Sequence, residues 1–421
     1  MNYPESQRRF VITGMGVMAP NGHELPVFWD SVRSARSSAG PMTRFPVEDS
    51  PVGAACEIRG FEPGDYMEAK VAKRLDRSTQ YAIAAARMAV KDSGLNITAL
   101  QADRVGVVEG TTVSTLDAAT RSAEAWKKRG YRGISLFSMV NGYSGSGSGE
   151  LAMELGIKGH AITLSSGSAS GNDVMGYALS MLRDGEADVM VAGGAEAPIQ
   201  PLVWGAFCQS RVMAVNRDDP AHAMKPFDVA RSGFVLGEGA GFVVMEELTH
   251  ALSRGARIYA EVCGHGRACE AFHPVAPEPN GAGAILAMQR AMKSGDITAS
   301  EVDYVNAHGT ATDANDVVET RAIKTVFGAL ARRVAISSTK PVTGHLMAAA
   351  GAVETVITAL ALHEQVIPPT ANHRVPDPEC DLDYVPQTAR PYPIRVALNL
   401  SCGFGGKNSC LALRRWPTPA R

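Results

Sequence analysis

The chain has 421 residues, of which 45% are hydrophobic and 20% charged, and its formal net charge at pH 7 is −2. This length is too great for one small core and suits two domains or one large double unit. A net charge near zero gives no reason to expect nucleic acid or a membrane as a partner. There is no signal-peptide pattern, no bilayer-length uncharged run, and no zinc or CxxC pattern among the seven cysteines. We therefore expect a cytoplasmic α/β protein with reduced thiols.

Apolar and polar segments alternate along the chain with glycine-rich turns between them. Residues 10–17 are expected to form a strand that runs into a glycine-rich turn, and the GxG of this segment is too weak a signal to indicate nucleotide binding. Further strands are expected at 105–108, 187–194 and 233–246, and a helix at 69–93. This alternation predicts a layered α/β fold.

Two polar stretches and one boundary complete this outline. Residues 214–232 and 264–284 are rich in Pro, Asp and Gly, which predicts surface loops. The rhythm of strands and helices restarts near residue 255, where we place a boundary between two halves. The halves share a rough strand–helix–strand cadence although their residues do not repeat, and this fits an ancient duplication.

The segment 161–178 predicts a short strand, a sharp turn of small residues and a helix with one buried face. Ser168 stands at the turn, where free backbone N–H groups and the helix dipole favour developing negative charge. This arrangement is typical of a nucleophile elbow, although the Gly-x-Ser-x-Gly consensus is absent. For this segment alone, a loop that only caps the helix is the simpler interpretation.

Three later strands each end in a loop of small residues. His308 follows the first, Lys340 and His345 follow the second, and the third runs into the glycine-rich turn 401–408. A single histidine is more often structural than catalytic. Two histidines at strand ends beside glycine, one of them five residues after a lysine, indicate a site, because catalytic groups of α/β proteins collect on such loops.

Taken in order, these clusters identify a family. The motifs VITGMG, ADVMVAGGAE, KPFD, GEG, NAHGT, STKPVTGH and GFGG run along essentially the whole chain. The chain thereby resembles the elongating β-ketoacyl-acyl carrier protein synthases, which include fatty-acid condensing enzymes and type II polyketide ketosynthases. The resemblance implies an α/β thiolase fold with a five-layered αβαβα core. Its two similar halves would be residues 1–255, with the elbow, and residues 256–421, with the histidines and the gate loop.

The resemblance also implies roles for residues of this chain. Ser168 stands where active members carry the nucleophilic cysteine. His308 and His345 match the two histidines that assist malonyl decarboxylation and stabilise the enolate and the thioester oxyanion. Lys340 matches the family lysine of its loop, and Glu354 matches the supporting acidic residue on the following helix.

The remaining implied residues surround the substrate. Phe404 matches the gating phenylalanine, next to Gly405, and its backbone N–H would form the oxyanion hole with that of Ser168. Thr310 and Thr312 would line the channel for the pantetheine arm. Phe207 and Cys402 complete the expected substrate-binding set; Cys402 stands where many relatives have phenylalanine.

The implied reaction is a decarboxylative Claisen condensation of a malonyl thioester with an acyl chain, in fatty-acid or polyketide synthesis. The charge of the carbanion falls on the thioester oxygen, where two neutral imidazole N–H donors in a dry pocket would stabilise it. The substrates would be carried on the phosphopantetheine of acyl carrier protein, and we expect no metal and no cofactor. The family also implies a homodimer, or a heterodimer with a related subunit.

Ser168 is the main departure from the family pattern. A serine hydroxyl is far less acidic than a thiol, and an acyl-serine ester is a poorer electrophile than a thioester. Three explanations stay open: an engineered replacement that traps a substrate, a natural enzyme that transfers, hydrolyses or only decarboxylates, and a non-condensing partner subunit like the chain-length factors. Because both histidines remain, we favour a condensing-enzyme scaffold with an altered nucleophile.

Overall fold

A computed structural model describes residues 8–97 and 102–416 of the chain, which build two five-stranded sheets from two successive series of strands. The strands of the first sheet are β1 (Phe10–Met18), β4 (Val105–Gly110), β5 (Ala161–Leu164), β6 (Val189–Glu196) and β8 (Gly239–Glu247). Those of the second are β9 (Ala260–Cys269), β10 (Val302–Asn306), β11 (Ala335–Ser337), β14 (Val396–Gly403) and β15 (Lys407–Arg415).

The two sheets have the same topology. Counted along the chain, the main-sheet strands of each half lie side by side in the order third, second, fourth, fifth, first. In each half the first three strands of this order are parallel to one another. The fourth runs antiparallel to the third, and the fifth runs antiparallel to the fourth. The edge strands β1 and β9 meet antiparallel and join the two sheets into one. The repeat that the residues do not show is therefore present in the topology, and the fold is the thiolase fold.

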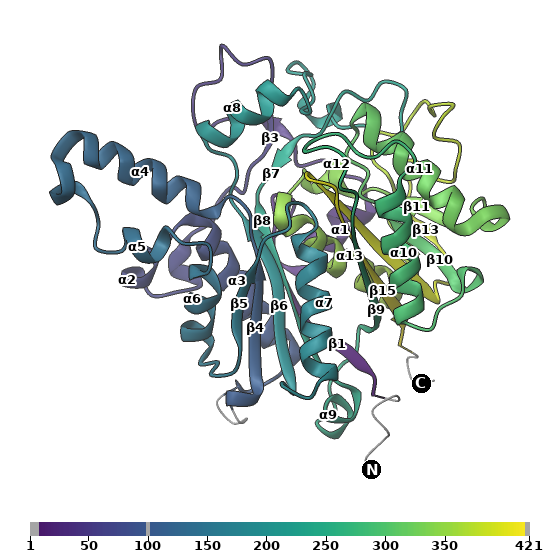
Figure 1. Ribbon diagram of the computed structural model, residues 1–421, viewed down its shortest axis with the longest axis horizontal. Helices are drawn as coiled ribbons and strands as arrows, with labels where there is room; N and C mark the ends of the chain where they lie inside the picture. Colours follow the sequence, from purple (N-terminus) through teal and green to yellow (C-terminus); the bar gives the residue numbers. More distant parts are fainter. Residues whose placement is uncertain (1–7, 98–101, 417–421) are drawn as a thin grey trace.

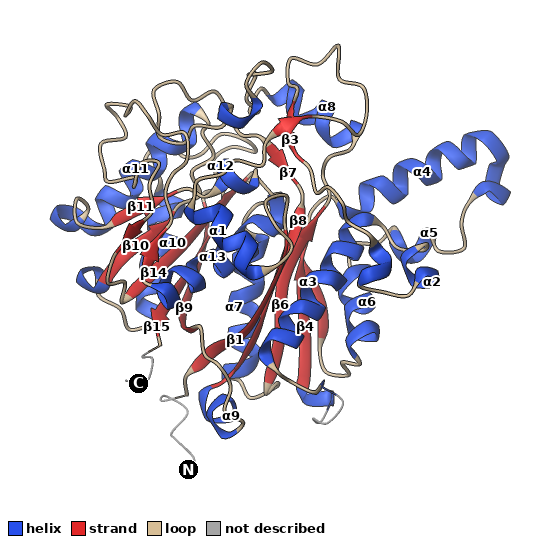
Figure 2. Cartoon of the chain, turned by 180° about the vertical axis from the view of Figure 1, so that it is seen from behind, coloured by secondary structure: helices blue, strands red, loops and turns tan. Residues whose placement is uncertain are grey.

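Helices cover both sheets and fill the space between them (Figures 1 and 2). α3 (Arg77–Ser93) packs on the outer face of the first sheet, and α10 (Ala282–Ser294) on the outer face of the second, with α11 (Asp313–Phe327) beside it. Between the sheets lie α7 (Ser170–Arg183) and α13 (Ala350–Glu364), which contact strands of both halves. α13 is buried from Ala350 to Leu362 because it has no polar face, as a helix enclosed on all sides requires. This order of layers is αβαβα.

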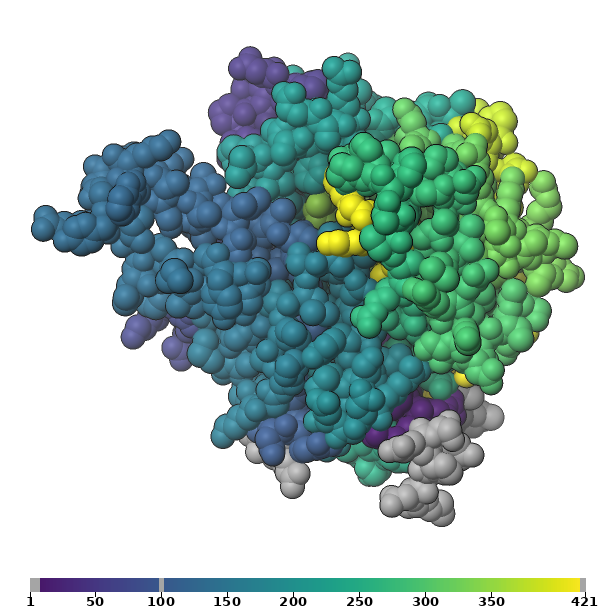
Figure 3. Space-filling view, viewed as in Figure 1, coloured from purple at the N-terminus to yellow at the C-terminus, as the bar shows by residue number. Residues whose placement is uncertain are grey.

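The connection between β4 and β5 leaves the body of the molecule. It contains α4 (Ser114–Arg129), the 3₁₀ turn η5 (Gly130–Gly133), α5 (Ser138–Asn141) and α6 (Ser146–Leu155). α4 projects outward, at the left of Figures 1 and 3, and only Ala118 of this helix is buried. This projection begins next to the end of β4, close to the elbow in the fold.

Two expectations about secondary structure were wrong. The helix expected at 69–93 is divided into α2 (Ala69–Ala72) and α3, because the carboxylate of Asp76 accepts the backbone N–H of Thr79 and starts a new helix. The loop expected at 264–284 begins as strand, since β9 continues to Cys269. Its glycines are packing positions: a Cβ at Gly266 would lie 2.1 Å from the carbonyl oxygen of Ala287 in α10.

The remaining elements are short or peripheral. They are α1 (Leu25–Arg33), β2 (Gly40–Pro41), β3 (Ala54–Cys56), η2 (Pro63–Asp65), η4 (Ala102–Arg104), α8 (Pro201–Ser210), η6 (Pro220–His222), β7 (Leu236–Gly237), α9 (Leu248–Ser253), η7 (Ala299–Glu301), η8 (Gly328–Leu330), α12 (Lys340–Thr343), η9 (Met347–Ala349), β12 (Val366–Ile367) and β13 (Arg390–Pro391). Within the described ranges, no helix is both long and apolar enough to cross a membrane.

Candidate active site

Ser168 lies in the turn between β5 and α7, where the chain reverses over very few residues. Gly167 has a φ of +67°, in the left-handed region that favours glycine, and this lets the turn close. The hydroxyl of Ser170 donates to the carbonyl of Gly167 and accepts the backbone N–H of Ser166. The elbow is thus held by short contacts among small residues, and Ser168 is buried at the start of α7.

His345 is the direct partner of Ser168. Its Nε2 atom lies 3.1 Å from the hydroxyl oxygen of Ser168, and its Nδ1 atom accepts the backbone N–H of Met347 at 3.3 Å. A neutral imidazole whose Nδ1 is an acceptor carries its proton on Nε2, so His345 donates a hydrogen bond to the serine. The edge of the Phe234 ring packs against the imidazole, with 5.0 Å between the ring centroids.

His308 approaches the same point from the end of β10. Its ring meets that of His345 almost at a right angle, with 5.5 Å between the centroids. The carboxylate of Glu319, on α11, accepts the backbone N–H groups of His308 and Gly309 at 2.6 and 2.8 Å and so fixes the loop. Burial raises the pKa of Glu319 to about 7, and these hydrogen bonds oppose the rise.

A buried ion pair stands behind the two histidines. The ammonium of Lys340, at the start of α12, lies 2.6 Å from the carboxylate of Glu354 on α13, and both side chains are buried. Burial lowers the pKa of His308 and of His345 well below the usual histidine value, and the positive charge of Lys340 lowers it further. Both imidazoles are therefore neutral at physiological pH.

The turn after β14 passes close to the elbow. A Cβ placed on Gly403 would lie 3.1 Å from the backbone nitrogen of Ser168, so the two backbones are in contact. Phe404 is 42% exposed, and its ring lies 6.3 Å, centroid to centroid, from that of Phe207 on α8. Gly405 has a φ of +81°, which lets the turn close, and it is not among the residues that line the cavity described next.

These groups surround one cavity of about 400 Å³, whose walls are mostly apolar. Most of the site residues expected from the sequence line it, namely Ser168, Phe207, His308, Thr310, Thr312, His345, Cys402 and Phe404. Lys340 and Glu354 lie behind the histidines, outside the lining. Burial raises the pKa of the Cys402 thiol well above its usual value, which argues against Cys402 as a substitute nucleophile.

The structure adds residues that were not assigned a role from the sequence. Thr112, Val113, Val212 and Met347 line the cavity, and Glu319 fixes the His308 loop. Glu319 stands on the helix that follows the His308 loop, and an acid at that place was the only signal in the sequence. The others are ordinary apolar or small residues from distant segments, and nothing in their local sequence sets them apart.

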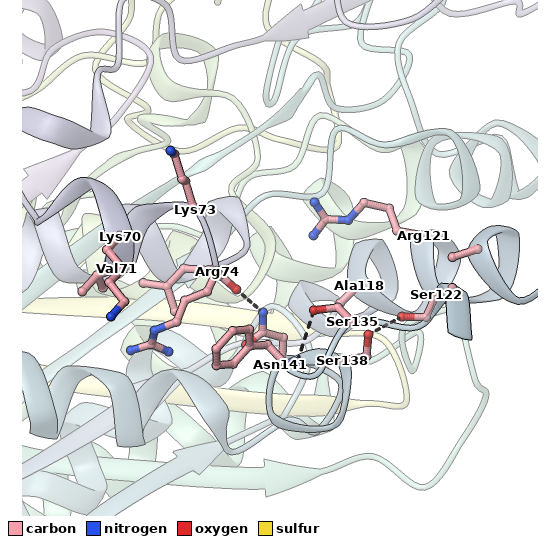
Figure 4. A pocket seen from close by; sticks show the side chains of 14 residues that line it. Lys70, Val71, Lys73, Arg74, Ala118, Arg121, Ser122, Ser135, Ser138 and Asn141 are labelled. Atoms are coloured by element: carbon pink, nitrogen blue, oxygen red, sulfur yellow. Dashed lines mark hydrogen bonds between the residues drawn. The ribbon is translucent and has the colours of Figure 1, made fainter. Parts of the chain in front are cut away.

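A second cavity, of about 900 Å³, lies away from the serine, between α2 and the projecting α4. Figure 4 shows Arg121 approaching from α4, and Lys70, Lys73 and Arg74 from α2 and the residues after it. Arg74 is paired with Glu150, and Arg121 with Asp117, while Lys70 and Lys73 are exposed and have no ion-pair partner within the described ranges. This basic cluster is suited to an acidic partner.

Comparison with known proteins identifies the family. Residues 7–251 match the family described as Beta-ketoacyl synthase, N-terminal domain, and residues 259–374 match Beta-ketoacyl synthase, C-terminal domain. The chain belongs to the β-ketoacyl synthases. A 3-oxoacyl-[acyl-carrier-protein] synthase 2 from Synechocystis is 40% identical over 97% of this chain and 99% of that protein, and one from Staphylococcus aureus is 39% identical over 97% and 99%.

Solved β-ketoacyl synthase structures agree with this assignment. A type II polyketide ketosynthase, determined in complex with its acyl-carrier protein and bound to a hexaketide, superimposes with a TM-score of 0.91 at 33% identity, covering 97% of this chain and 100% of that one. The ishigamide ketosynthase/chain length factor gives a TM-score of 0.91 at 36% identity, with the same coverage. The expected family, the thiolase fold and a place among the elongating ketosynthases are thereby confirmed, whereas the boundary near residue 255 and the roles of individual residues stay predictions.

Proposed function

We propose that this protein acts on malonyl and acyl groups carried on the phosphopantetheine of an acyl carrier protein, by the decarboxylative chemistry of ketosynthases, with Ser168 in the place of the nucleophile. The observation that carries the proposal is the convergence of two neutral, buried histidines on Ser168. When a malonyl thioester loses carbon dioxide, the electrons of the breaking carbon–carbon bond move into the thioester carbonyl and form an enolate. Neutral imidazole N–H groups stabilise that oxygen by donating hydrogen bonds to it while they keep their protons.

The condensation step needs a second event at the elbow. The acyl chain must pass from its carrier thioester to the side-chain oxygen of residue 168, which releases the carrier thiol. The enolate carbon then attacks the ester carbonyl while the bond to the side-chain oxygen breaks and that oxygen takes up a proton. The N–H groups of Ser168 and of Phe404, which follows the Gly403 that packs against the elbow, are our candidates for the oxyanion donors of this step. Serine performs the loading step poorly unless a base takes its proton.

The hydrogen bond between His345 and Ser168 argues against a serine hydrolase. A general base must present an unprotonated nitrogen to the hydroxyl, as in Ser–His pairs. Here the nitrogen that faces Ser168 carries the proton, because Met347 donates to the other one. His345 is therefore arranged as a donor, and we infer that decarboxylation is intact in this chain while acyl loading is slow.

A mass-spectrometric assay with malonyl- and acyl-carrier protein tests this directly. We expect the protein to convert malonyl- to acetyl-carrier protein, and to form the β-ketoacyl product at least ~100-fold more slowly than its Ser168→Cys variant, the range that a missing general base costs. Ser180→Cys, on an exposed part of α7, is the matched control and should not gain condensation. If neither the protein nor Ser168→Cys decarboxylates or condenses, the proposal is wrong.

The partner-subunit alternative concerns the surface around β5. Among the residues that the structure describes, β5 is the edge strand of the sheet and pairs only with β4, so a row of backbone groups is open to a second chain. Nearby α5 and α6 expose large apolar side chains; Met139 is 82% exposed and Met153 67%. We infer that a second β-ketoacyl synthase chain covers this surface, either another copy or a related subunit. Mass photometry of the purified chain, alone and with a cysteine-bearing paralogue, distinguishes the two.

A further inference from the structure

A carboxylate and an imidazole from different halves of the chain meet behind the elbow. Asp173, in the first turn of α7, has its Oδ1 atom 3.4 Å from Nε2 of His265 on β9. The side chains of Asp173 and His265 are only 17% and 10% exposed, respectively. The chemistry proposed above uses neither residue, and a buried charge lowers stability unless its contacts offset that cost. We call these two residues the elbow pair.

Asp173 holds the backbone of the elbow itself. Its Oδ2 atom accepts the hydroxyl of Ser166, two residues before Ser168, at 2.5 Å. Burial raises the pKa of Asp173, but the neighbouring His265 and the hydroxyl of Ser166 lower it, and the net result is below the usual value. The carboxylate is therefore charged at physiological pH. Its bond to Ser166 is charge-assisted, which makes it stronger than the bonds between neutral groups in the same turn.

His265 connects that carboxylate to the sheet of the second half. Its Nε2 atom lies 2.8 Å from the hydroxyl oxygen of Ser409, a buried residue of β15. Its ring packs on Gly176 of α7, where a Cβ would lie 2.0 Å from Nδ1, so only glycine leaves room for the imidazole. The imidazole is thus held by β15 and by α7, with the same nitrogen facing Ser409 and Asp173.

One oxygen of the elbow pair is left incompletely bonded. Oδ1 of Asp173 is buried and receives no hydrogen bond from any residue that the structure describes, since Nε2 of His265 stands 3.4 Å away and closer to Ser409. A buried oxygen of this kind lowers stability, and apolar side chains of similar volume would avoid the cost. Stability therefore does not explain why α7 carries an aspartate at this place.

The residue before Asp173 anchors the same turn of α7 to the strand that leads to Phe404. The side-chain amide of Asn172 donates to the backbone carbonyl of Asn399 at 2.9 Å and to the hydroxyl of Ser401 at 3.1 Å, both on β14. The amide of Asn399 donates back to Asn172 at 2.9 Å. Two consecutive residues of α7 therefore tie the elbow to the second half, one through β14 and the other through β9 and β15.

We propose that Asp173 and His265 are positioning residues for acyl transfer at residue 168. They do not touch the substrate. They hold the backbone at Ser166, and with it the side chain and N–H of residue 168, in place against the second half of the chain, which carries His345. This inference rests on the proposed function and deepens it, because it assigns the elbow pair to the acyl-transfer step and not to decarboxylation.

The elbow pair should affect only one of the two chemical steps. Decarboxylation depends on the histidine loops, which are held by Glu319 on α11 and Glu354 on α13. Acyl transfer depends on the alignment of residue 168 with the acyl carbonyl, and a misplacement of about 1 Å costs ~100-fold in rate. A merely structural role would slow both reactions together, whereas a positioning role slows acyl transfer alone.

The test uses the Ser168→Cys variant as the parent protein. Its condensation with acyl- and malonyl-carrier protein, and its decarboxylation of malonyl-carrier protein alone, are measured by mass spectrometry on one preparation. The ratio of the two kcat values does not depend on the fraction of protein that is folded. Adding Asp173→Ala should lower kcat for condensation by ~10- to 100-fold and leave decarboxylation and the KM for acyl-carrier protein unchanged. Adding His265→Phe, which keeps a ring but has no N–H, should act in the same direction.

Conservative variants and a matched control sharpen the test. Asp173→Asn keeps an oxygen that accepts the hydroxyl of Ser166, and His265→Gln keeps an N–H donor, so each should recover part of the condensation rate. Asp303→Asn is the control for Asp173→Asn. Its carboxylate is 11% exposed and pairs with Arg395, but it stands at the start of β10, at the other end of the strand from the His308 loop. This variant should leave the ratio of the two rates unchanged.

The outcomes separate this inference from the proposed function. An unchanged ratio for Asp173→Ala or for His265→Phe, whether the two rates fall together or stay as they were, contradicts the inference and leaves the proposed function standing. If the parent Ser168→Cys variant neither decarboxylates nor condenses, the proposed function fails and the inference fails with it.

Discussion

The two sides of the active site are built differently. The elbow, from the first half, is held mostly by hydroxyl and backbone contacts of small residues, such as that of Ser170 with Gly167, and one carboxylate, that of Asp173, accepts the hydroxyl of Ser166. The histidine loops, from the second half, are held by buried carboxylates, with Glu319 under His308 and Glu354 paired with Lys340. Buried charges are costly unless they are paired and hydrogen-bonded, so the positions of the two histidine loops depend on keeping these two carboxylates in place.

This difference separates two chemical steps. The histidine side keeps what decarboxylation needs, which is neutral donors in a dry cavity with a fixed proton position on His345. The elbow keeps the geometry of acyl transfer but has a serine without a base. We therefore expect changes on the histidine side to slow decarboxylation, whereas the Ser168→Cys change at the elbow should add condensation.

The largest effect is expected from breaking the buried pair. Glu354→Ala leaves the ammonium of Lys340 buried and alone, which should lower the free energy of unfolding by about 3–5 kcal/mol. Denaturant unfolding followed by circular dichroism measures it. Glu364→Ala, at the exposed end of the same helix, is the control and should cost less than about 0.5 kcal/mol. If the two variants unfold at the same denaturant concentration, the ion pair of Lys340 and Glu354 does not stabilise the histidine side.

Removing a donor should be the next largest effect. His345→Ala should slow malonyl decarboxylation by ~100- to 1000-fold, the usual cost of losing one oxyanion donor, with the fold unchanged. His345→Gln keeps an N–H donor and should recover part of the rate. His222→Ala, at a half-buried histidine outside the Ser168 cavity, is the control. Decarboxylation by His345→Ala at the full rate would contradict the donor role.

The residues that line the cavity are easier to predict from the sequence than the contacts that hold those residues in place. Strands that end in small-residue loops marked Ser168, His308 and His345, because spacing and local chemistry carry that information. The proton position on His345 depends on the N–H of Met347, a non-glycine residue with a φ of +53°. Such a backbone conformation is set by tertiary contacts and leaves no trace in the local sequence.

The fold shows the same limit. Alternating apolar segments predict the layers, but the common strand order of the two halves is visible only in the structure. The composition of residues 264–284 predicts a loop at Gly264 and Gly266, whereas both glycines let α10 pack closely on β9. Glycine in a strand that a helix approaches and glycine in a loop look alike in a sequence, since both positions lack a side chain.

A smaller effect is expected from the basic cluster next to α4. Reversing Lys70 and Lys73 together to Glu should raise the KM for the carrier protein about tenfold at low salt and leave kcat nearly unchanged, because docking is weakened and the chemistry is not. The difference should shrink at high salt, where these charges are screened. Reversing Lys158 and Lys293, which are exposed elsewhere, is the control. Equal KM values for the two double variants would exclude the cluster as the docking surface.

The smallest effect is a near absence of pH dependence on the histidine side. His308 and His345 have folded-state pKa values well below the usual 6.5, so both stay neutral as the pH falls from 8 to 6, and decarboxylation should change less than about twofold. Stability should behave differently. Below about pH 6.5 the unfolded chain binds protons on these histidines and the folded chain does not, so the free energy of unfolding is full above that pH and falls as the pH is lowered.

Condensation at the elbow should depend on pH where decarboxylation does not, and this gives the two sides distinct signatures. Condensation by Ser168→Cys requires the thiolate, so its rate should fall as the pH drops below the pKa of that thiol, while decarboxylation by the same variant stays level. Rates of both reactions measured on one preparation from pH 8 to 6 separate them. A tenfold loss of decarboxylation with a midpoint near pH 6.5 would mean that the histidines titrate normally, and the electrostatic division between the elbow and the histidine loops would then be wrong.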